Sequence, residues 1–514
     1  MKRIRFDLNG EWIKKSENWR FGLGCDHAFQ LHRKDLFEQL KYVHDELGFQ
    51  YLRFHGIFDD DMLTYQRMSD YKPLSAIPHT KDIYEINFQQ VGDVYHNVLD
   101  AGFKPFVEIS FMPSALAKGK KTGLKYKNNI CMPKSLSKWE HFVKEFIHYL
   151  IGEFGKEEVE SWYFEIWNEP DLGIFFNGKQ KDYFKLYVST VKAIKEVDGN
   201  LRVGGPSTSA CKWLKDFVDY CKANNVPCDF VSTHHYTGDA FGNMLTVKNA
   251  LKMFPITKRN AKNGVGIGET LCEYFFYPEI CKTWKKGTFN AMDKNALEEV
   301  SGLPLFITEW NSMAVFGAPV HDEKYSSAFA IKTALDLNPA IAGSSFWCVS
   351  DIFEENHYLQ KPFCGSYGIV TQNNIAKPNF WAFKIMSMLY ENRLKLEITN
   401  EDIEYAVFKD DEGNYQIVIY NQDFVYGKDQ SYDFEIELPF EPAEIVEYRI
   451  DDDHANPKKM WVEMGSPSTI NRTQIEDIKE KTALRGQKIE ANGNRIVSTI
   501  HTNDIVMYEI KRGE

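Results

Sequence analysis

The middle of the chain alternates between two kinds of hydrophobic pattern. Between about residue 20 and residue 390, short apolar or β-branched runs are followed by longer stretches whose apolar residues recur at helical spacing. This alternation predicts repeated strand–helix units and a parallel sheet. Eight runs qualify as strands, which is the number that closes a (β/α)8 barrel. They cover residues 20–25, 51–56, 105–111, 161–167, 202–205, 229–236, 305–310 and 343–349.

The intervening stretches have the marks of amphipathic helices. In residues 34–47 the apolar side chains form one stripe, and Gly48 follows where a helix C-cap favours glycine. Residues 137–140, Ser-Lys-Trp-Glu, predict a capping box at the start of another helix. Residues 182–197 repeat the striped pattern. Such stripes fill cores, so we assign them no chemistry.

One connection is much longer than the others. Residues 238–302 separate the sixth predicted strand from the seventh, and they include Phe254-Pro255, an aromatic cluster at 274–277 and a basic stretch at 282–286. Loops of this length on a barrel cover the active face or make a contact between subunits. The sequence does not choose between these roles, so a homo-oligomer stays open.

After about residue 392 the pattern changes to strand-like segments separated by turn signals, as at 405–409, 416–420, 433–438, 445–450 and 505–510. This texture predicts an antiparallel β-domain. The first residues of the chain are strand-like as well. We therefore expect an α/β fold in which residues 20–390 form a (β/α)8 TIM barrel, with residues 1–19 plus 391–514 forming an accessory antiparallel β-sandwich.

Charge and composition narrow the range of partners. The 514-residue chain has a formal net charge of −12 and no clustered run of Lys and Arg, so a nucleic-acid partner is not expected. No stretch of about 18 uncharged apolar residues predicts a membrane span, and residues 1–8 lack the apolar core of a signal peptide. Nine scattered cysteines without a CxxC pair favour free thiols over disulfides or a zinc site, which predicts a cytoplasmic protein.

Two carboxylates stand out where predicted barrel strands end. Strand four ends in Asn168-Glu169-Pro170 and strand seven in Thr308-Glu309-Trp310. In a (β/α)8 barrel, catalytic groups project from the carboxyl ends of strands, so both acids could face one sugar. Glycoside hydrolysis needs such a pair, one acid for the leaving oxygen and one carboxylate at the anomeric carbon. Each Glu alone could instead cap a helix or pair with a surface Lys; their joint position at strand ends favours chemistry.

Several stretches carry a family resemblance. Trp167-Asn168-Glu169-Pro170 and Ile307-Thr308-Glu309-Trp310 resemble the acid/base and nucleophile signatures of the large clan of retaining (β/α)8 glycosidases. The resemblance narrows to glycoside hydrolase family 39, the β-xylosidase and α-L-iduronidase family. It implies that Glu169 is the catalytic acid/base and Glu309 the nucleophile, and no cofactor or metal is expected. The matching stretches are 47–56, 105–113, 164–172, 229–236 and 351–355.

The resemblance also implies residues that contact the sugar. Asn168 would hydrogen-bond the 2-hydroxyl, where contacts strengthen in the transition state. The −1 pocket would be lined by His55, His234 and Trp347, and outer hydroxyls would be bound by Glu354 and Glu355.

Further residues would act on the nucleophile. Tyr236 would donate a hydrogen bond to Glu309, and Arg53 would keep Glu309 ionised. Trp347 could instead be plain barrel packing. His235 should point into the helix layer, because neighbouring strand residues face opposite sides. One departure from the family is residues 362–368, where a histidine is usual and none is present.

The substrate choice within the family rests on charge. A uronic acid would need a cation in its pocket, whereas this chain offers Tyr236 and the acidic pair Glu354-Glu355. We therefore expect a retaining, exo-acting hydrolase that releases xylose from the non-reducing end of β-xylosides. An α-L-arabinopyranoside, a β-glucoside or an α-L-iduronide are alternative substrates. Alternatives from other classes are a non-hydrolytic carbohydrate-binding protein and a metal-dependent barrel enzyme that uses His55, His234 and His235 as ligands.

Overall fold

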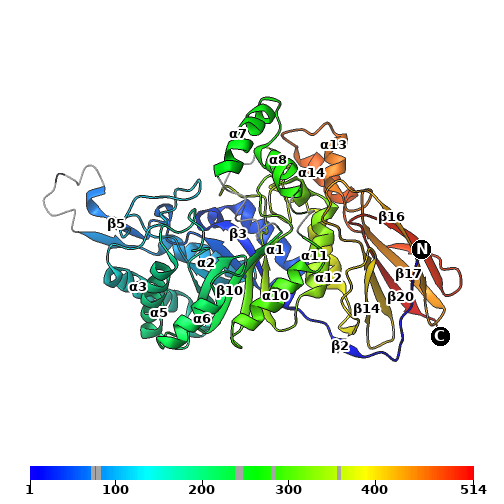
Figure 1. Cartoon of the computed structure of the whole chain (residues 1–514), viewed down its shortest axis with the longest axis horizontal. Helices are drawn as coiled ribbons and strands as arrows, with labels where there is room; N and C mark the ends of the chain where they lie inside the picture. Colours follow the sequence, from blue (N-terminus) through cyan, green and yellow to red (C-terminus); the bar gives the residue numbers. More distant parts are fainter. Residues whose placement is uncertain are drawn as a thin grey trace.

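A closed barrel of parallel strands forms the centre of the computed structural model, which describes residues 1–70, 76, 83–237, 247–278, 280, 284–355 and 361–513. The strands follow one another around the barrel in the order β10-β11-β12-β3-β4-β7-β8-β9. The predicted (β/α)8 barrel is therefore confirmed (Figure 1). Its strands are β3 (Gly22–His27), β4 (Tyr51–His55), β7 (Lys104–Ile109), β8 (Tyr163–Ile166), β9 (Arg202–Ser209), β10 (Phe230–Tyr236), β11 (Leu305–Asn311) and β12 (Ile341–Phe346).

Helices follow the barrel strands along the chain. The first, α1, ends as predicted, because Gly48 adopts a left-handed φ of 73° and its N–H donates to the carbonyl of His44 at 2.8 Å. The other helices of this layer and their short extensions are α2 (Gln89–Asp100), α3 (Leu136–Phe154), α4 (Lys156–Glu160), α5 (Gln180–Val197), α6 (Leu214–Ala223), α10 (Thr288–Glu299), α11 (Lys324–Asp336) and α12 (Pro378–Met388), in addition to α1 (Lys34–Leu47).

The capping box predicted at residues 137–140 is wrong. Helix α3 begins at Leu136, and its N-cap is Ser135, whose side chain accepts a hydrogen bond from the N–H of Lys138 at 3.4 Å. Ser137 lies inside the first turn, where its hydroxyl contacts that of Ser135 at 2.9 Å. The earlier serine takes the capping position because it alone has the extended backbone that an N-cap needs.

Aromatic side chains close the amino-terminal end of the barrel. Phe106, Phe230 and Phe306 lie within the first three residues of their strands and pack together with Phe21, with ring centroids 4.9–6.0 Å apart. These rings make a solid floor, since the interior of such a barrel is a packed core and no pore. Any site must therefore lie above them, at the carboxyl ends of the strands.

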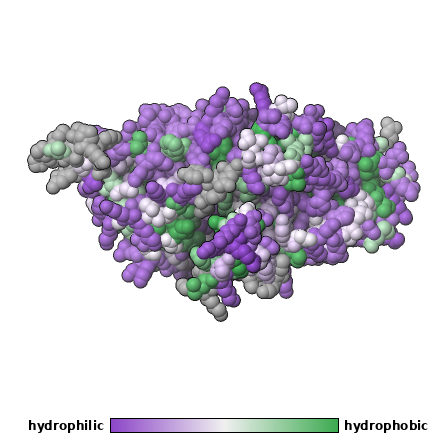
Figure 2. Space-filling model, turned by 90° about the horizontal axis from the view of Figure 1, so that it is seen from above, coloured by the Kyte–Doolittle hydropathy of each residue, from purple (hydrophilic) through white to green (hydrophobic). Residues whose placement is uncertain are grey.

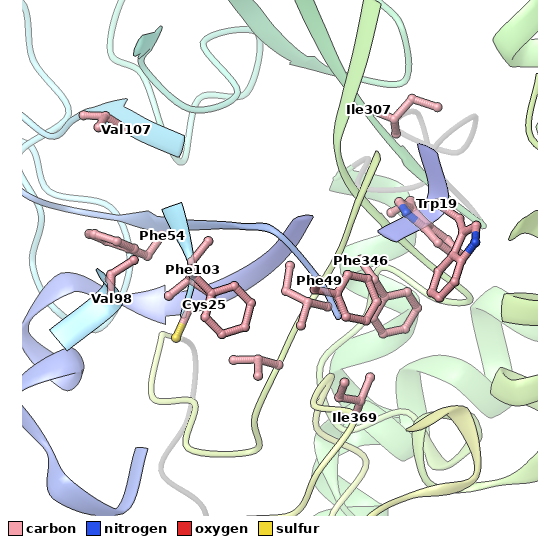
Figure 3. Packing of buried hydrophobic residues seen from close by; sticks show 14 of the residues in the cluster. Trp19, Cys25, Phe49, Phe54, Val98, Phe103, Val107, Ile307, Phe346 and Ile369 are labelled. Carbon is pink, nitrogen blue, oxygen red and sulfur yellow. The ribbon is translucent and has the colours of Figure 1, made fainter. Parts of the chain in front are cut away.

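A second apolar layer joins the strands to the helices. Trp19 stacks on Phe383 of α12 with ring centroids 5.8 Å apart and meets the edge of Phe49 at 5.6 Å. Figure 3 shows Trp19, Phe49 and Phe346 gathered in this layer. Because these residues come from opposite ends of the barrel sequence, their contacts help to close the barrel between its first and last strands.

The long connection between β10 and β11 is mostly helical. It contains α7 (Val247–Lys262), α8 (Ile267–Leu271), a π-helical turn at Cys272–Phe276 and then α10. Helix α7 projects from the barrel in Figure 1, and its Leu251 and Phe254 are 72% and 71% exposed. Residues 238–246, 279 and 281–283 of the connection, including Lys282, lie outside the described residues.

Two sheets form the second part of the molecule, at the right of Figure 1. The larger sheet has the order β18-β17-β20-β15-β14-β13-β2 and is antiparallel, whereas β1 runs parallel to β16 in the smaller sheet β1-β16-β19. Apolar residues from both sheets form one core, which makes this a β-sandwich as predicted. The strands are β1 (Lys2–Ile4), β2 (Trp12–Lys14), β13 (Asn392–Leu394), β14 (Glu404–Lys409), β15 (Tyr415–Tyr420), β16 (Ser431–Glu437), β17 (Pro442–Ile450), β18 (Gln487–Ile489), β19 (Arg495–His501) and β20 (Ile505–Arg512).

Two helices that the sequence reasoning did not predict interrupt the sandwich between β17 and β18. They are α13 (Pro457–Glu463) and α14 (Arg472–Lys481). Trp461 and Ile478 of these helices pack with Phe363 and Ile375 from the barrel's last loop. The two helices therefore form an apolar contact between the sandwich and the barrel. A short hairpin, β5 (Tyr65–Arg67) with β6 (Tyr84–Ile86), lies apart from both sheets.

The face of the molecule shown in Figure 2 is largely hydrophilic, with apolar residues in small scattered areas. Within the described part of the chain, no helix combines the length and the apolar character that crossing a bilayer requires.

Candidate active site

Glu169 is held at the barrel mouth by an unusual turn of the backbone. Strand β8 ends at Ile166, and the following residues Trp167 and Glu169 both have left-handed φ values, 74° and 38°. The N–H of Glu169 donates to the carbonyl of Ser207 at 2.9 Å, which ties the turn to β9. Non-glycine residues in this region cluster at functional sites, where surrounding contacts enforce them. The turn places the Glu169 side chain next to His234 of β10, where it is 11% exposed.

His234 lies between Glu169 and the second carboxylate. It pairs with Glu309 in the register of β10 and β11, and a shift in that register falls between Thr233 and His234. Its Nδ1 is 3.0 Å from Oε1 of Glu169 and 3.6 Å from Oε2 of Glu309. Because both oxygens lie on one nitrogen, their separation cannot exceed the sum of these distances. The structure therefore brings the two predicted catalytic acids together.

Glu309 is surrounded by hydrogen-bond donors. The hydroxyl of Tyr236 donates to Oε2 at 2.6 Å, and a guanidinium nitrogen of Arg53 donates to Oε1 at 2.6 Å. Nε2 of His55 is 3.7 Å from Oε1. These groups stabilise the charged carboxylate, whose side chain is only 7% exposed.

Arg53 connects Glu309 to carboxylates deeper in the barrel. Its side chain is fully buried and forms ion pairs with Glu165 at 2.6 Å and Glu108 at 2.8 Å as well as with Glu309. It also donates to Oδ1 of Asn168 at 3.0 Å. A buried arginine of this kind needs several charged partners to offset its loss of hydration, and its planar fork can serve them together.

The sequence reasoning missed three residues of this network. Glu108 holds Nδ1 of His55 at 2.7 Å, which orients the ring. Glu165 also accepts a hydrogen bond from Thr308 at 2.9 Å. Ser207 contacts both Nε2 of His234 at 3.0 Å and Arg53 at 3.1 Å. The sequence did contain a signal for two of these residues, because Glu108 and Glu165 are charged residues inside predicted strands that are otherwise apolar.

The surroundings push the pKa values of the two acids apart. Burial raises the pKa of Glu169, and the negative charges of Glu309 and Asp171 add to that effect while His234 opposes it. Burial would also raise the pKa of Glu309, but His234, Arg53, His55 and the Tyr236 hydroxyl outweigh it and lower that pKa. A carboxyl that keeps its proton beside one that stays ionised is the arrangement of an acid and a nucleophile.

Aromatic rings form one wall beside the acids. Trp347 is 3% exposed and packs with Tyr236, Phe353 and Tyr367. Its ring centroid is 4.8 Å from that of His55, at an interplanar angle of 38°. Trp347 therefore takes part in packing and at the same time lies against a residue that contacts Glu309.

The acidic pair after strand β12 is split in the structure. Glu355 is buried, and burial, Asp26, Glu309 and Glu169 raise its pKa to about 8, with His55 opposing. Glu354 instead accepts a hydrogen bond from Gln30 at 3.1 Å and lies 3.8 Å from Arg33. Glu355 is thus the member of the pair that shares an electrostatic environment with Glu169 and Glu309.

His235 faces the helix layer, as strand alternation predicts. Its Nδ1 is 2.9 Å from Asp293 of α10, and its ring meets the edge of Phe289. Among the residues that the structure describes, no group of three or more His, Cys, Asp and Glu side chains is arranged to hold a metal ion.

Comparison with known proteins agrees with this geometry. The family model of glycosyl hydrolases family 39 matches residues 2–261 and 271–494. A β-xylosidase of Caldicellulosiruptor saccharolyticus is 35% identical over 511 residues, covering 97% of this chain and 96% of that protein. A β-xylosidase of Geobacillus stearothermophilus is 29% identical over 520 residues, covering 100% of this chain and 96% of that protein.

A solved structure shares the architecture as well. The family 39 β-xylosidase of Caulobacter crescentus superimposes with a TM-score of 0.74 at 26% identity, covering 99% of this chain and 100% of that one. Likeness along nearly the whole length, together with paired carboxylates at two barrel strand ends, leads to one conclusion. This chain is a glycoside hydrolase and belongs to glycosyl hydrolases family 39.

Proposed function

We propose that this protein is a retaining, exo-acting β-xylosidase that works by double displacement, with Glu309 as nucleophile and Glu169 as acid/base. The observation that carries the proposal is the meeting of both carboxylates on one nitrogen of His234. This shared contact sets an upper limit on the distance between the two carboxyls. That limit lies near the lower end of the roughly 6.5–9.5 Å typical of inverting enzymes, and it accommodates the ~5–5.5 Å of retaining ones.

The first step forms a covalent glycosyl-enzyme. Glu169, whose pKa is raised by burial, gives its proton to the glycosidic oxygen as the bond to the leaving group breaks. Glu309, kept ionised by Arg53 and Tyr236, attacks the anomeric carbon. In the second step Glu169 takes a proton from water, the water oxygen bonds to the anomeric carbon, and Glu309 leaves as the carboxylate.

Charge and enclosure support a neutral terminal sugar. Arg53 and His55 are already paired with Glu108, so neither offers a free positive charge to a uronate. The carboxyl of Glu355 adds negative or neutral polar character rather than a counter-ion. The low exposure of Glu169 and Glu309 supports a site that takes a chain end.

A panel of aryl glycosides tests the sugar. The 4-nitrophenyl β-D-xyloside should be hydrolysed with a kcat/KM at least ten times that of the α-L-arabinopyranoside, the β-glucoside and the α-L-iduronide. Proton NMR should show β-xylose as the first product, before mutarotation. A better substrate elsewhere in the panel would overturn the sugar, and α-xylose appearing first would overturn retention.

A further inference from the structure

A second cluster of reactive side chains lies on the outer side of the barrel wall. His235 of β10 points away from the side that carries His234 and Tyr236, because successive strand residues face opposite sides, and it is fully buried. Its Nε2 contacts Sγ of Cys211, and its Nδ1 is 2.9 Å from Oδ1 of Asp293. Three elements meet here: the loop after β9, strand β10 and helix α10.

The order of these groups is that of a nucleophile, a base and an orienting acid. With Asp293 facing Nδ1, the ring keeps its proton on that nitrogen and presents the lone pair of Nε2 to the Cys211 thiol. Burial alone would lower the pKa of His235, but Cys211 and Asp293 outweigh it and raise that pKa well above the usual range. The thiol proton of Cys211 therefore has an acceptor beside it.

Cys211 is held in place yet partly exposed. Its N–H donates to Oγ1 of Thr233 at 3.1 Å, and the N–H of Ala210 donates to the carbonyl of His234 at 3.1 Å. The neighbouring Lys212 directs its ammonium to Asp171 at 3.0 Å. Among the residues that the structure describes, the charged groups that face the sulfur are His235 and, behind it, Asp293. Cys211 is thus partly exposed, whereas the base beside it is fully buried.

We propose that Cys211 passes its thiol proton to His235 and is thereby an activated thiol, a modification site for small electrophiles and peroxides. With hydrogen peroxide, the thiolate sulfur bonds to one oxygen as the O–O bond breaks, and the departing hydroxide takes the proton from His235. The sulfur is oxidised to a sulfenic acid and the peroxide is reduced to water. This reactivity is independent of glycoside hydrolysis, because no group of the cluster contacts Glu169 or Glu309.

Alkylation of the unmodified protein tests the proposal. Limiting iodoacetamide is added at pH 6 and pH 8, and each cysteine is quantified by peptide mass spectrometry. A short unstructured peptide with one cysteine, added to the same reaction, serves as the reference, because the Cys221 thiol lowers the pKa of Cys228 and burial raises that of Cys364 to about 12. A free thiol with a pKa of about 8.5 should react roughly 75-fold faster at pH 8 than at pH 6.

Cys211 should react at least ten times faster than the reference peptide at pH 6, and its rate should change less than about three-fold between the two pH values. A rate that follows the reference peptide, in size or in pH dependence, would overturn the proposal. The Asp293→Asn variant is a second test, made on protein whose fold is checked by circular dichroism. The alkylation rate of Cys211 in this variant should regain the pH dependence of a free thiol. With hydrogen peroxide and dimedone, the adduct should form first at Cys211, and first labelling elsewhere would count against it.

Discussion

Replacing Tyr236 with Phe removes one hydrogen bond from Glu309, the proposed nucleophile, and keeps the ring. The lost hydroxyl donates to Glu309 at 2.6 Å, and both side chains are buried. A hydrogen bond to a charged group contributes about 1.5–3 kcal/mol, and one pKa unit corresponds to about 1.36 kcal/mol. The pKa of Glu309 should therefore rise by about 1–2 units in Tyr236→Phe.

The sign follows from which form the hydroxyl stabilises. Tyr236 helps to lower the pKa of Glu309 by donating to its ionised form, so removing the donor favours the protonated form. Because the nucleophile must be ionised, the acid limb of kcat/KM should move to higher pH by the same amount. The assay is hydrolysis of 4-nitrophenyl β-D-xyloside between pH 4 and pH 9, followed at substrate concentrations well below KM.

Tyr367→Phe is the matched control. Tyr367 belongs to the same aromatic cluster, but its hydroxyl donates to the carbonyl of Ala314 at 2.9 Å instead of to the nucleophile. Its loss should leave the acid limb in place. The reasoning would be refuted by a Tyr236→Phe profile that keeps the wild-type acid limb, or by equal displacement in the two variants.

Two further predictions concern the other carboxyls. Glu169→Gln should hydrolyse alkyl xylosides at least 1,000-fold more slowly, a loss of about 4 kcal/mol in transition-state stabilisation. In burst kinetics the variant should keep fast glycosylation from a dinitrophenyl xyloside, and its pH–rate profile should lose the alkaline limb. Equal losses for both leaving groups would contradict the role of Glu169 as acid. Glu355→Gln should raise the melting temperature more at pH 8 than at pH 5: the pKa of Glu355 is raised to about 8 in the folded chain, so folding loses stability as the unfolded carboxyl ionises above its ordinary pKa of about 4.3. A difference in melting temperature that is constant with pH would contradict it.

The barrel and the meeting of Glu169 with Glu309 could be predicted because their signals are local. Strand–helix alternation sets the architecture, and the strand-end rule then selects Glu169 and Glu309 from a long list of carboxyls. Alternation within β10 likewise separates His234 from His235. Each of these inferences needs only the spacing of residues along one segment.

The network beneath the acids could not be predicted in the same way. Arg53 comes from β4, whereas its partners Glu108 and Glu165 come from β7 and β8. Which of these residues meet depends on strand register, and the register around the barrel contains shifts such as that at His234. A register shift of one residue turns every following side chain of the strand to the opposite face. Which side chains pair across strands can therefore be read only from the folded structure.

The sandwich shows a second limit. Strand β19 was not predicted, although its buried Ile496 and Ile500 alternate with exposed residues in the manner of a strand that is half covered. Helices α13 and α14 lie among strand-like segments, and each is short. Their stability comes from packing of Trp461 and Ile478 against a barrel loop, which is a tertiary contact that local propensity does not report.

Trapping of the covalent intermediate tests the assignment of Glu309 most directly. A 2,4-dinitrophenyl 2-deoxy-2-fluoro-β-xyloside should react quickly because its leaving group needs no proton, while the fluorine destabilises the transition states of both steps and lets the glycosyl-enzyme accumulate. The account predicts release of one dinitrophenolate per chain and a fluoroxylosyl adduct on the peptide that contains Glu309. An adduct on Glu169 or on any other carboxyl, or turnover through a free product without an adduct, would contradict it.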